Sequence, residues 1–277
     1  MKTSSFDLIV LDLDGTILNP QKATRISDAV FSVVQDLHRA GIRVTIGTGR
    51  TLDLMRGYAQ QLGITLPVIT TQGAVIAGPI TGEIFSETLL PLTEARKVAA
   101  WVDESHFTTV FYFTDSEGHV TIYQNQMEGD SEFYDHVFGS PRSHQPDFSA
   151  LLQGEDAHPP VKFITINDPA SSQDITPELT ERFSQLTITR THAKLVEGTA
   201  KEVTKGAGLQ KLCQILGVDP QRVMAIGDND NDIPMLEAAG LGIAMGNASA
   251  GAKAVADWIA PTIEEDGVAV ALRKWVL

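Results

Sequence analysis

Two aspartates, two residues apart, follow an apolar segment near the start of the chain. The run Leu8–Leu11 is short and contains β-branched residues, which is typical of a strand buried on both faces. Side chains alternate along a strand, so Asp12 and Asp14 point the same way, and Gly15 then allows a close turn. Two adjacent carboxylates at the end of a buried strand are costly unless a cation neutralises them, and oxygen ligands favour a hard cation such as Mg²⁺. The pair alone equally fits a solvated acidic loop, so the interpretation depends on the rest of the chain.

Other polar groups also follow apolar segments. Thr48 and Gly49 come directly after the predicted strand 42–46, and the acidic run Asp228–Asp232 comes after the predicted strand 222–226. Lys205 opens a predicted helix just upstream of the second of these strands. Ligands of open parallel sheets bind at the carboxyl ends of the strands. If these strands are parallel neighbours, their polar groups meet at one edge.

This set of groups suits phosphoryl transfer. A carboxylate can attack phosphorus, but it repels the phosphate by about 4 kcal/mol at about 4 Å and an effective dielectric of about 20. Mg²⁺ and a lysine would remove that repulsion. Thr48 and the amide of Gly49 can donate hydrogen bonds to phosphate oxygens, and a second carboxylate can protonate the leaving oxygen and then activate water.

The elements that would position these groups form an α/β pattern. Helical periodicity begins after Ser27 and stops at Gly41, and a second helix ends at Gly63. With the strands 8–11, 42–46 and 67–70, these helices predict a βαβαβ unit with parallel strands. A similar pattern returns near the end of the chain, with a helix over 202–216, strands over 222–226 and 241–245, and a last helix through Trp275.

The middle of the chain has a different pattern, which predicts an inserted α/β domain with a mostly antiparallel sheet. Its expected elements are a helix at about 93–105, a hairpin of strands 109–114 and 120–124 joined by Asp115–Gly118, a helix around 130–138, a loop over 140–160, a strand at 161–166, a helix at 176–186 and strands at 187–191 and 194–196. We therefore expect residues 1–84 and 198–277 to form a Rossmann-like core domain, and residues 85–197 to form the inserted domain.

Composition excludes several classes of protein. The 277 residues carry a formal net charge of −14, which disfavours binding to a nucleic-acid backbone. The single cysteine, Cys213, excludes an intramolecular disulfide and a cysteine-built zinc site. The sequence shows no signal peptide and no apolar stretch of about 18 residues that could span a membrane. We expect a soluble cytoplasmic protein with neither a membrane nor a nucleic acid as partner.

Four motifs in order resemble those of the haloacid dehalogenase superfamily. They are DLDGT at 12–16, TGR at 48–50, Lys205 followed by glycine, and GDNDND at 227–232. The α/β insert between the second and third motifs is similar to the type IIB cap of the Cof-type phosphatases. The family usually has asparagine where this chain has Gln72, which leaves the role of that position open. Asp14 excludes the dehalogenase branch, which lacks this carboxylate.

The resemblance implies a role for each motif residue. Asp12 would be the nucleophile that becomes an aspartyl phosphate and a ligand of Mg²⁺, and Asp14 would be the general acid and base, with its main-chain carbonyl on the metal. Lys205 would neutralise the nucleophile and the phosphate. The remaining members would hold the phosphate (Thr48, Gly49, Asn231) or belong to the metal site (Asp228, Asp232). Asp232 could also cap the following helix, which is compatible with a place in the metal site, and Arg50 could either tie loops together or contact the substrate.

Three functions follow from these observations. The first is a magnesium-dependent phosphatase that hydrolyses a small phosphorylated metabolite, such as a sugar phosphate, through an aspartyl phosphate. The second is a phosphomutase of the same superfamily, which returns the phosphoryl group to its substrate. The third is a phospho-aspartate signalling module, which would be about half this length and would lack the insert. The sequence leaves the substrate and the oligomeric state open, although side chains in 115–118 or 140–160 are candidates for selecting the substrate.

Overall fold

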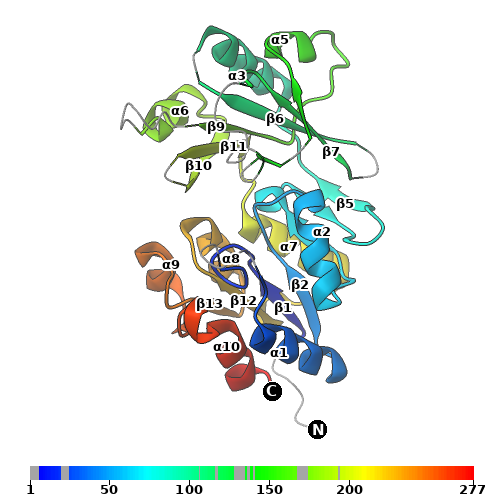
Figure 1. The fold of residues 1–277 in the computed structure, drawn as a ribbon, viewed down its shortest axis with the longest axis vertical. Coiled ribbons are helices and arrows are strands. Elements are labelled where there is room, and N and C mark those ends of the chain that lie inside the picture. The colour runs from blue at the N-terminus through cyan, green and yellow to red at the C-terminus, as the bar shows by residue number, and fades with distance from the viewer. Residues whose placement is uncertain are drawn as a thin grey trace. The chain divides into compact units, whose positions relative to one another are not determined.

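The computed structural model forms two compact units (Figure 1). It describes residues 6–19, 25–105, 107–115, 118–127, 135, 138–139, 141–166, 174–192 and 194–277. One unit combines Met1–Ser86 with Thr204–Leu277, and the other is the continuous stretch Glu87–Val203. The boundary expected after residue 197 falls inside strand β11 (Leu195–Ala200), and the boundary expected after residue 84 falls inside β5 (Ile84–Glu87).

The two-segment unit is built on a five-stranded parallel sheet with the order β14-β13-β12-β1-β2. Its strands are β1 (Leu8–Leu11), β2 (Arg43–Ile46), β12 (Val223–Gly227), β13 (Leu241–Ala244) and β14 (Trp258–Ile259). All four pairings are parallel, and Leu11 lies opposite both Ile46 and Ile226. The prediction of an α/β fold with a Rossmann-like, mostly parallel sheet is confirmed. The aligned register brings the ends of β1, β2 and β12 to the same level.

The helices of this unit begin and end where local signals place them. They are α1 (Asp28–Arg39), α2 (Leu52–Leu62), α7 (Lys205–Leu216), α8 (Ile233–Ala238), α9 (Ala250–Val255) and α10 (Gly267–Trp275). Ser27 caps α1 by accepting a hydrogen bond from the Val30 amide, as its sequence position predicts. The prediction for α7 was three residues too long, because Thr204 caps the helix and Glu202 has a φ of 71°. Lys205 is therefore the first helical residue.

The third strand of the predicted βαβαβ unit lies parallel to the end of β2, as expected, but it belongs to a second sheet and not to the five-stranded one. β3 (Val68–Thr70) pairs antiparallel with β4 (Val75–Ala77) in a sheet ordered β3-β4-β5, and an isolated parallel bridge joins Ile69 to Gly47 at the end of β2. The antiparallel pairing of β3 with β4 is due to the turn Thr71–Gly73. All three of its residues have positive φ, and they send the chain back along β3.

The second unit contains a six-stranded sheet ordered β10-β11-β9-β6-β7-β8. Its remaining strands are β6 (Thr109–Thr114), β7 (Val120–Gln124), β8 (Arg142–His144), β9 (Lys162–Ile166) and β10 (Leu186–His192), and its helices are α3 (Leu92–Glu104), α5 (Phe148–Leu151) and α6 (Thr176–Arg182). All pairings in this sheet are antiparallel except β7 with β8, which confirms the expected sheet type. Residues of α3, α5 and α6 share one apolar core with Phe111, Phe163 and Val196 of the sheet.

One part of this insert differs from expectation, and two others lie outside the residues that the structure describes. The stretch expected to be a loop over 140–160 contains β8 and α5. The expected helix around 130–138 lies mostly outside the described residues, as do the two central residues of the Asp115–Gly118 turn. Asp115 and His119 are nevertheless joined by a main-chain hydrogen bond of 3.0 Å, which closes the β6–β7 hairpin.

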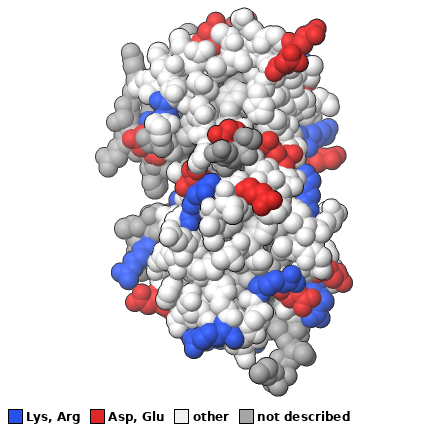
Figure 2. All heavy atoms as spheres, turned by 90° about the vertical axis from the view of Figure 1, so that its right-hand side faces the viewer, with Lys and Arg blue, Asp and Glu red and all other residues white. Residues whose placement is uncertain are grey.

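The surface gives two further observations. On the face drawn in Figure 2, the described lysine and arginine side chains lie in separate groups between acidic and uncharged ones, without a continuous basic strip. Such a strip is what a nucleic-acid backbone requires. Within the described part of the chain, no helix combines the length and the apolar character needed to cross a bilayer.

Candidate active site

Three carboxylates converge at the carboxyl ends of β1 and β12. Oxygen atoms of Asp12, Asp228 and Asp232 all lie within 4.8 Å of one another, although two of these residues are separated from the first by more than 200 positions in the sequence. Asp12 is 3% exposed and Asp232 is fully buried. The sequence argument predicted this convergence, and the register of the parallel sheet explains it.

Two of the three acids, Asp12 and Asp228, have raised pKa values, so both hold their protons more tightly than an exposed aspartate does. Burial and the charge of Asp232 raise the pKa of Asp12 well above its usual range, although Lys205 acts in the opposite direction. Burial and Asp232 also raise the pKa of Asp228 to about 7. An oxygen-rich donor set with too much negative charge is the environment that a hard divalent cation neutralises, so these three residues fit Mg²⁺.

Lys205 supplies the positive charge inside the cluster. Its Nζ donates to Oδ1 of Asp12 at 2.6 Å and to Oδ1 of Asp232 at 2.5 Å, and the side chain is almost completely buried. Burial alone would lower the pKa of Lys205, but the two carboxylates outweigh it and raise the pKa, so the lysine is charged. The lysine therefore binds the expected nucleophile directly.

The side chain of Asp232 also binds the main chain of its own loop. Its Oδ2 accepts hydrogen bonds from the amides of Asp228 at 2.9 Å and Asn229 at 3.0 Å. The reciprocal bonds of Asn229 and Asp232 form a capping box around the short helix η3 (Asp230–Asp232). The expected cap of the following helix α8 is wrong, because no side-chain bond from Asp232 reaches that helix. Asp232 instead fixes the loop that carries Asp228.

The carboxylate of Asp14 is not among the three clustered carboxylates and pairs with Arg50. Nε of Arg50 donates to one oxygen at 2.8 Å, and a terminal nitrogen donates to the other at 2.6 Å. The Arg50 guanidinium also lies 5.3 Å from the ring centre of Tyr58. Of the two expectations for Arg50, the tie between loops is the one that the contacts support. The predicted metal contact of Asp14 was through its main-chain carbonyl, which these contacts do not involve.

We expect Arg50→Lys to have a small effect on stability. The Asp14 side chain is 49% exposed, so solvent screens the pair, and the free energy of unfolding should fall by less than about 1 kcal/mol. Urea denaturation measures this change, and Arg25→Lys in the exposed pair with Asp28 is the matched control. A loss of more than about 2 kcal/mol would contradict this assignment, because only a desolvated pair is worth that much.

The residues expected to hold phosphate lie around a strained turn. Thr48 is 1% exposed, and its hydroxyl accepts a hydrogen bond from the Arg50 amide at 3.1 Å. Asn231 donates from Nδ2 to Oε1 of Gln72 at 3.0 Å. Gln72 and its neighbour Thr71 both have φ values in the left-handed region, 59° and 52°, which costs on the order of 1–3 kcal/mol per residue. Strain of this kind persists only where the surrounding structure enforces it.

Two contacts around the acids were not predicted. The Thr16 hydroxyl donates to Oδ1 of Asp228 at 3.0 Å, and Nδ2 of Asn247 donates to the carbonyl of Gly15 at 2.8 Å. Gly15 has a φ of 88°, and a Cβ there would lie 2.2 Å from a carboxylate oxygen of Asp228, so this position requires glycine. Asn247 follows β13, and the rule that polar groups gather at strand ends could have indicated it.

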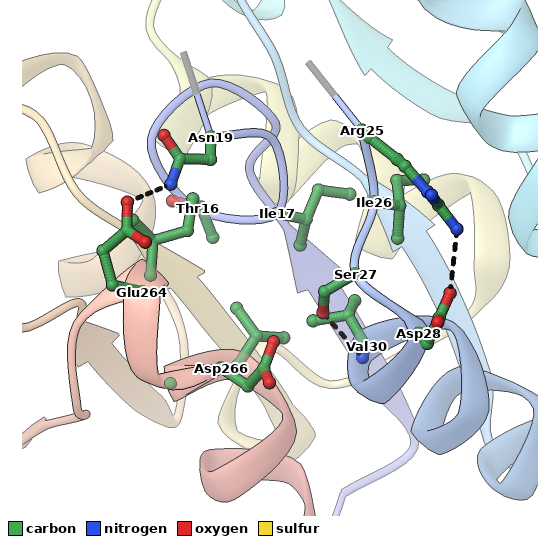
Figure 3. A pocket seen from close by; sticks show the side chains of 13 residues that line it. Thr16, Ile17, Asn19, Arg25, Ile26, Ser27, Asp28, Val30, Glu264 and Asp266 are labelled. Atoms are coloured by element: carbon green, nitrogen blue, oxygen red, sulfur yellow. Dashed lines mark hydrogen bonds and ion pairs between the residues drawn. The ribbon is translucent and has the colours of Figure 1, made fainter. Parts of the chain in front are cut away.

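Thr16 also lines a cavity of about 370 Å³ (Figure 3). Apolar side chains of Ile17, Ile26 and Val30 form part of its wall, and the carboxylates of Glu264 and Asp266 lie at its edge. None of the three clustered carboxylates lines this cavity, and neither does Lys205, so it lacks the groups that phosphoryl transfer would use. The carboxylate cluster beyond Thr16 remains the candidate site.

The pKa of Asp228 predicts how the stability of the metal-free protein depends on pH. Between pH 4 and pH 7 the unfolded chain has lost this proton, whereas the folded state keeps it, so stability should fall as the pH rises, by up to about 1.4 kcal/mol per pH unit. Thermal unfolding in a chelator at pH 5 and pH 7 measures the slope. Asp228→Asn should make the slope shallower, leaving the part that the raised pKa of Asp12 contributes, and an unchanged slope would show that Asp228 titrates normally.

The comparison with protein families decides the class. A model described as haloacid dehalogenase-like hydrolase matches residues 9–272 of the chain. The chain belongs to this family.

Individual haloacid dehalogenase-like hydrolases are similar to this chain over nearly its whole length. The curated 5-amino-6-(5-phospho-D-ribitylamino)uracil phosphatase YcsE of Bacillus subtilis (strain 168) is 32% identical over 270 residues, which cover 98% of this chain and 96% of the relative. A solved phosphatase of the superfamily from Bacteroides thetaiotaomicron has a TM-score of 0.81 at 25% identity, and the match covers 99% of this chain and 97% of that one. A subclass IIB sugar phosphatase has a TM-score of 0.76 at 23% identity, with 97% and 98% covered.

These likenesses confirm three predictions: the superfamily, the type IIB capped architecture and the phosphatase class. They also favour an enzyme over a phospho-aspartate signalling module, because the match extends across the inserted unit. In the geometry, Asp12, Asp228, Asp232 and Lys205 lie together, Thr48 lies at the end of the adjacent strand, and Asp14 is held by Arg50.

Proposed function

We propose that the protein is a magnesium-dependent phosphatase of a small phosphorylated metabolite and that Asp12 is its nucleophile. The observation that supports this most directly is Lys205 bound between Asp12 and Asp232 in a buried cluster of three carboxylates. A carboxylate that accepts a hydrogen bond from a charged lysine can approach an anionic phosphate, because the lysine offsets the repulsion between the two anions. Burial strengthens the attraction of the lysine for both. Mg²⁺ held by Asp12, Asp228 and Asp232 would neutralise the remaining charge between nucleophile and phosphate.

The reaction follows from the residues in two steps. A carboxylate oxygen of Asp12 attacks phosphorus, the bond from phosphorus to the leaving oxygen breaks, and Asp14 gives that oxygen its proton. Asp14 then removes a proton from water, the water oxygen attacks the aspartyl phosphate, and phosphate leaves while Asp12 is regenerated. Thr48, Gly49 and Asn231 hold the phosphate oxygens in both steps.

The contacts of Asp14 add a condition to this scheme. Both of its oxygens accept hydrogen bonds from Arg50, so neither oxygen can bind a leaving group in this arrangement. Asp14 must turn away from Arg50 before it can act on a leaving group.

The substrate class rests on the relatives. One of them is named for dephosphorylating 5-amino-6-(5-phospho-D-ribitylamino)uracil, a metabolite with a phosphate on a polyhydroxylated chain. We propose that this chain also acts on a phosphate carried by a polyol or a sugar. Because identity to that relative is 32%, the named compound is a first candidate to test.

The test measures released phosphate from an aryl phosphate and from a panel of polyol and sugar phosphates, with Mg²⁺ and with a chelator. We expect turnover that requires Mg²⁺ and is absent in Asp12→Asn. Equal rates for the wild type and this variant would end the proposal. Product analysis on hexose phosphates separates hydrolysis from the phosphomutase alternative, because a mutase would return an isomeric phosphate in place of free phosphate.

A further inference from the structure

We propose that Gln72 is a positioning residue that sets the spacing between Gly49 and Asn231. The inference rests on the proposed function, because it assigns both of these partners to the phosphate. Gln72 lies in the turn Thr71–Gly73, which is short, strained and buried between three parts of the candidate site.

The main chain of the turn is fastened to the loop after β2. The Thr71 amide donates to the carbonyl of Arg50 at 2.8 Å, and the Gln72 amide donates to the carbonyl of Thr48 at 3.2 Å. These bonds bracket Gly49 on both sides. The turn can therefore move only together with the loop that carries the phosphate-binding amide.

The same turn contacts the helix that carries the lysine. A Cβ at Gly73, where φ is 98°, would lie 2.2 Å from the carbonyl oxygen of Thr204. Thr204 is the N-cap of α7, and Lys205 is the first residue of that helix. The turn is thus pressed between the β2 loop and the start of α7, which explains why its backbone is held with positive φ.

The side chain of Gln72 connects two loops from different strands. Its Oε1 accepts the hydrogen bond from Nδ2 of Asn231, and its Nε2 lies so close to Gly49 that a Cβ there would be 2.4 Å away. The residue is 8% exposed, so solvent does not compete strongly for these contacts. One amide group therefore spans the distance from the β2 loop to η3.

The chemistry favours a neutral and long side chain at this position. The site already contains three carboxylates, so a fourth negative charge beside the phosphate would raise the cost of binding it. An amide can accept from Asn231 without adding charge. Asparagine is one methylene shorter than glutamine. With the same backbone, an asparagine at position 72 would either pull Asn231 toward Gly49 or lose its hydrogen bond to Asn231.

The test compares Gln72→Met, which keeps the length and loses the hydrogen bond, with Gln72→Asn, which keeps the amide and loses the length. Inorganic phosphate with Mg²⁺ serves as the probe, and its inhibition constant is measured beside KM and kcat. We expect both variants to weaken phosphate binding about tenfold, the effect of one lost hydrogen bond that positions a ligand, and to raise KM more than they lower kcat.

A double-mutant cycle separates positioning from a general loss of structure. If Gln72 acts through Asn231, the double variant Gln72→Met, Asn231→Ala should bind phosphate about as weakly as Asn231→Ala alone. Additive losses would overturn the proposal. Gln35→Met is the matched control. The Gln35 side chain donates a hydrogen bond of 3.1 Å to the Leu62 carbonyl, and neither residue belongs to the carboxylate cluster. This variant should leave the inhibition constant of phosphate unchanged.

The outcomes distinguish this inference from the proposed function. If the wild type is active, Asp12→Asn is inactive and both Gln72 variants bind phosphate like the wild type, the role of Gln72 is wrong and the function stands. If the wild type and Asp12→Asn release phosphate equally, the function itself fails. If Gln72→Met lowers the unfolding temperature more than Gln35→Met does, its weaker phosphate binding could come from a loss of structure. The test then depends on Gln72→Asn, and an unchanged inhibition constant of phosphate in that variant overturns the proposal.

Discussion

Asp12→Asn should lower kcat for phosphate release by at least about a thousandfold and leave the protein folded. The amide has nearly the shape of the carboxylate, but it is not a nucleophile toward phosphorus. Because Asp12 is one of three crowded carboxylates and its pKa is raised well above the usual range by burial, removing its charge relieves repulsion. The metal-free variant should therefore unfold at the same temperature as the wild type or at a higher one.

Single-turnover and steady-state assays of released phosphate measure the first effect, and thermal unfolding in a chelator measures the second. Asp36→Asn is a suitable control, since the partly exposed Asp36 side chain on α1 pairs with Arg39, away from the carboxylate cluster. A variant that lost activity through unfolding would show a lower transition temperature, and it would not support a role for Asp12 as nucleophile.

Lys205→Met should have the largest effect on stability. The substitution keeps much of the side-chain volume and leaves Asp12 and Asp232 buried without their cation, which costs roughly 3–5 kcal/mol. Activity should fall as well, because the nucleophile and the phosphate then repel each other without screening. Urea denaturation in a chelator measures the stability change.

Mg²⁺ should partly restore the stability of Lys205→Met. A ligand that binds only the folded state stabilises it by RT ln(1 + [L]/Kd), and the variant's more negative site should bind the cation more tightly. Adding Mg²⁺ should thus raise the unfolding temperature of the variant by more than that of the wild type. Arg25→Met is the control, as both side chains of its pair with Asp28 are exposed (75% and 95%), so the variant should change stability by less than about 1 kcal/mol. An equal response to Mg²⁺ in variant and wild type would contradict the proposed metal site.

Local patterns were sufficient for many elements of the fold. The hairpin strands β6 and β7 have the bounds that their alternating sequences predict, and α2 ends at Gly63, which adopts the left-handed conformation expected of a helix stop. The acids Asp12 and Asp228 were recognisable because each directly follows an unbroken apolar run. Once the strands are parallel and in register, their convergence follows from the sheet.

Other features depend on contacts that no short window of sequence contains. The sheet β3-β4-β5 depends on positive φ at Thr71 and Gln72, residue types that rarely adopt it, and neighbouring segments enforce that conformation. The bond from Asn231 to Gln72 spans 159 positions, and the bond from Thr16 to Asp228 spans 212. The pairing of Asp14 with Arg50 could not be predicted, because either side chain could equally have faced a substrate.

The position of β1 between β2 and β12 has a consequence for synthesis of the chain. The strand Leu8–Leu11 emerges from the ribosome early, but the neighbour on one of its sides, Val223–Gly227, is made only after the whole of Glu87–Val203. At about 5–20 residues per second, this apolar strand waits on the order of ten seconds or more with one edge unpaired. The continuous unit can fold during that interval, so we expect nascent chains truncated before Val223 to contain a protease-resistant insert and a protease-sensitive amino-terminal segment that depends on chaperones.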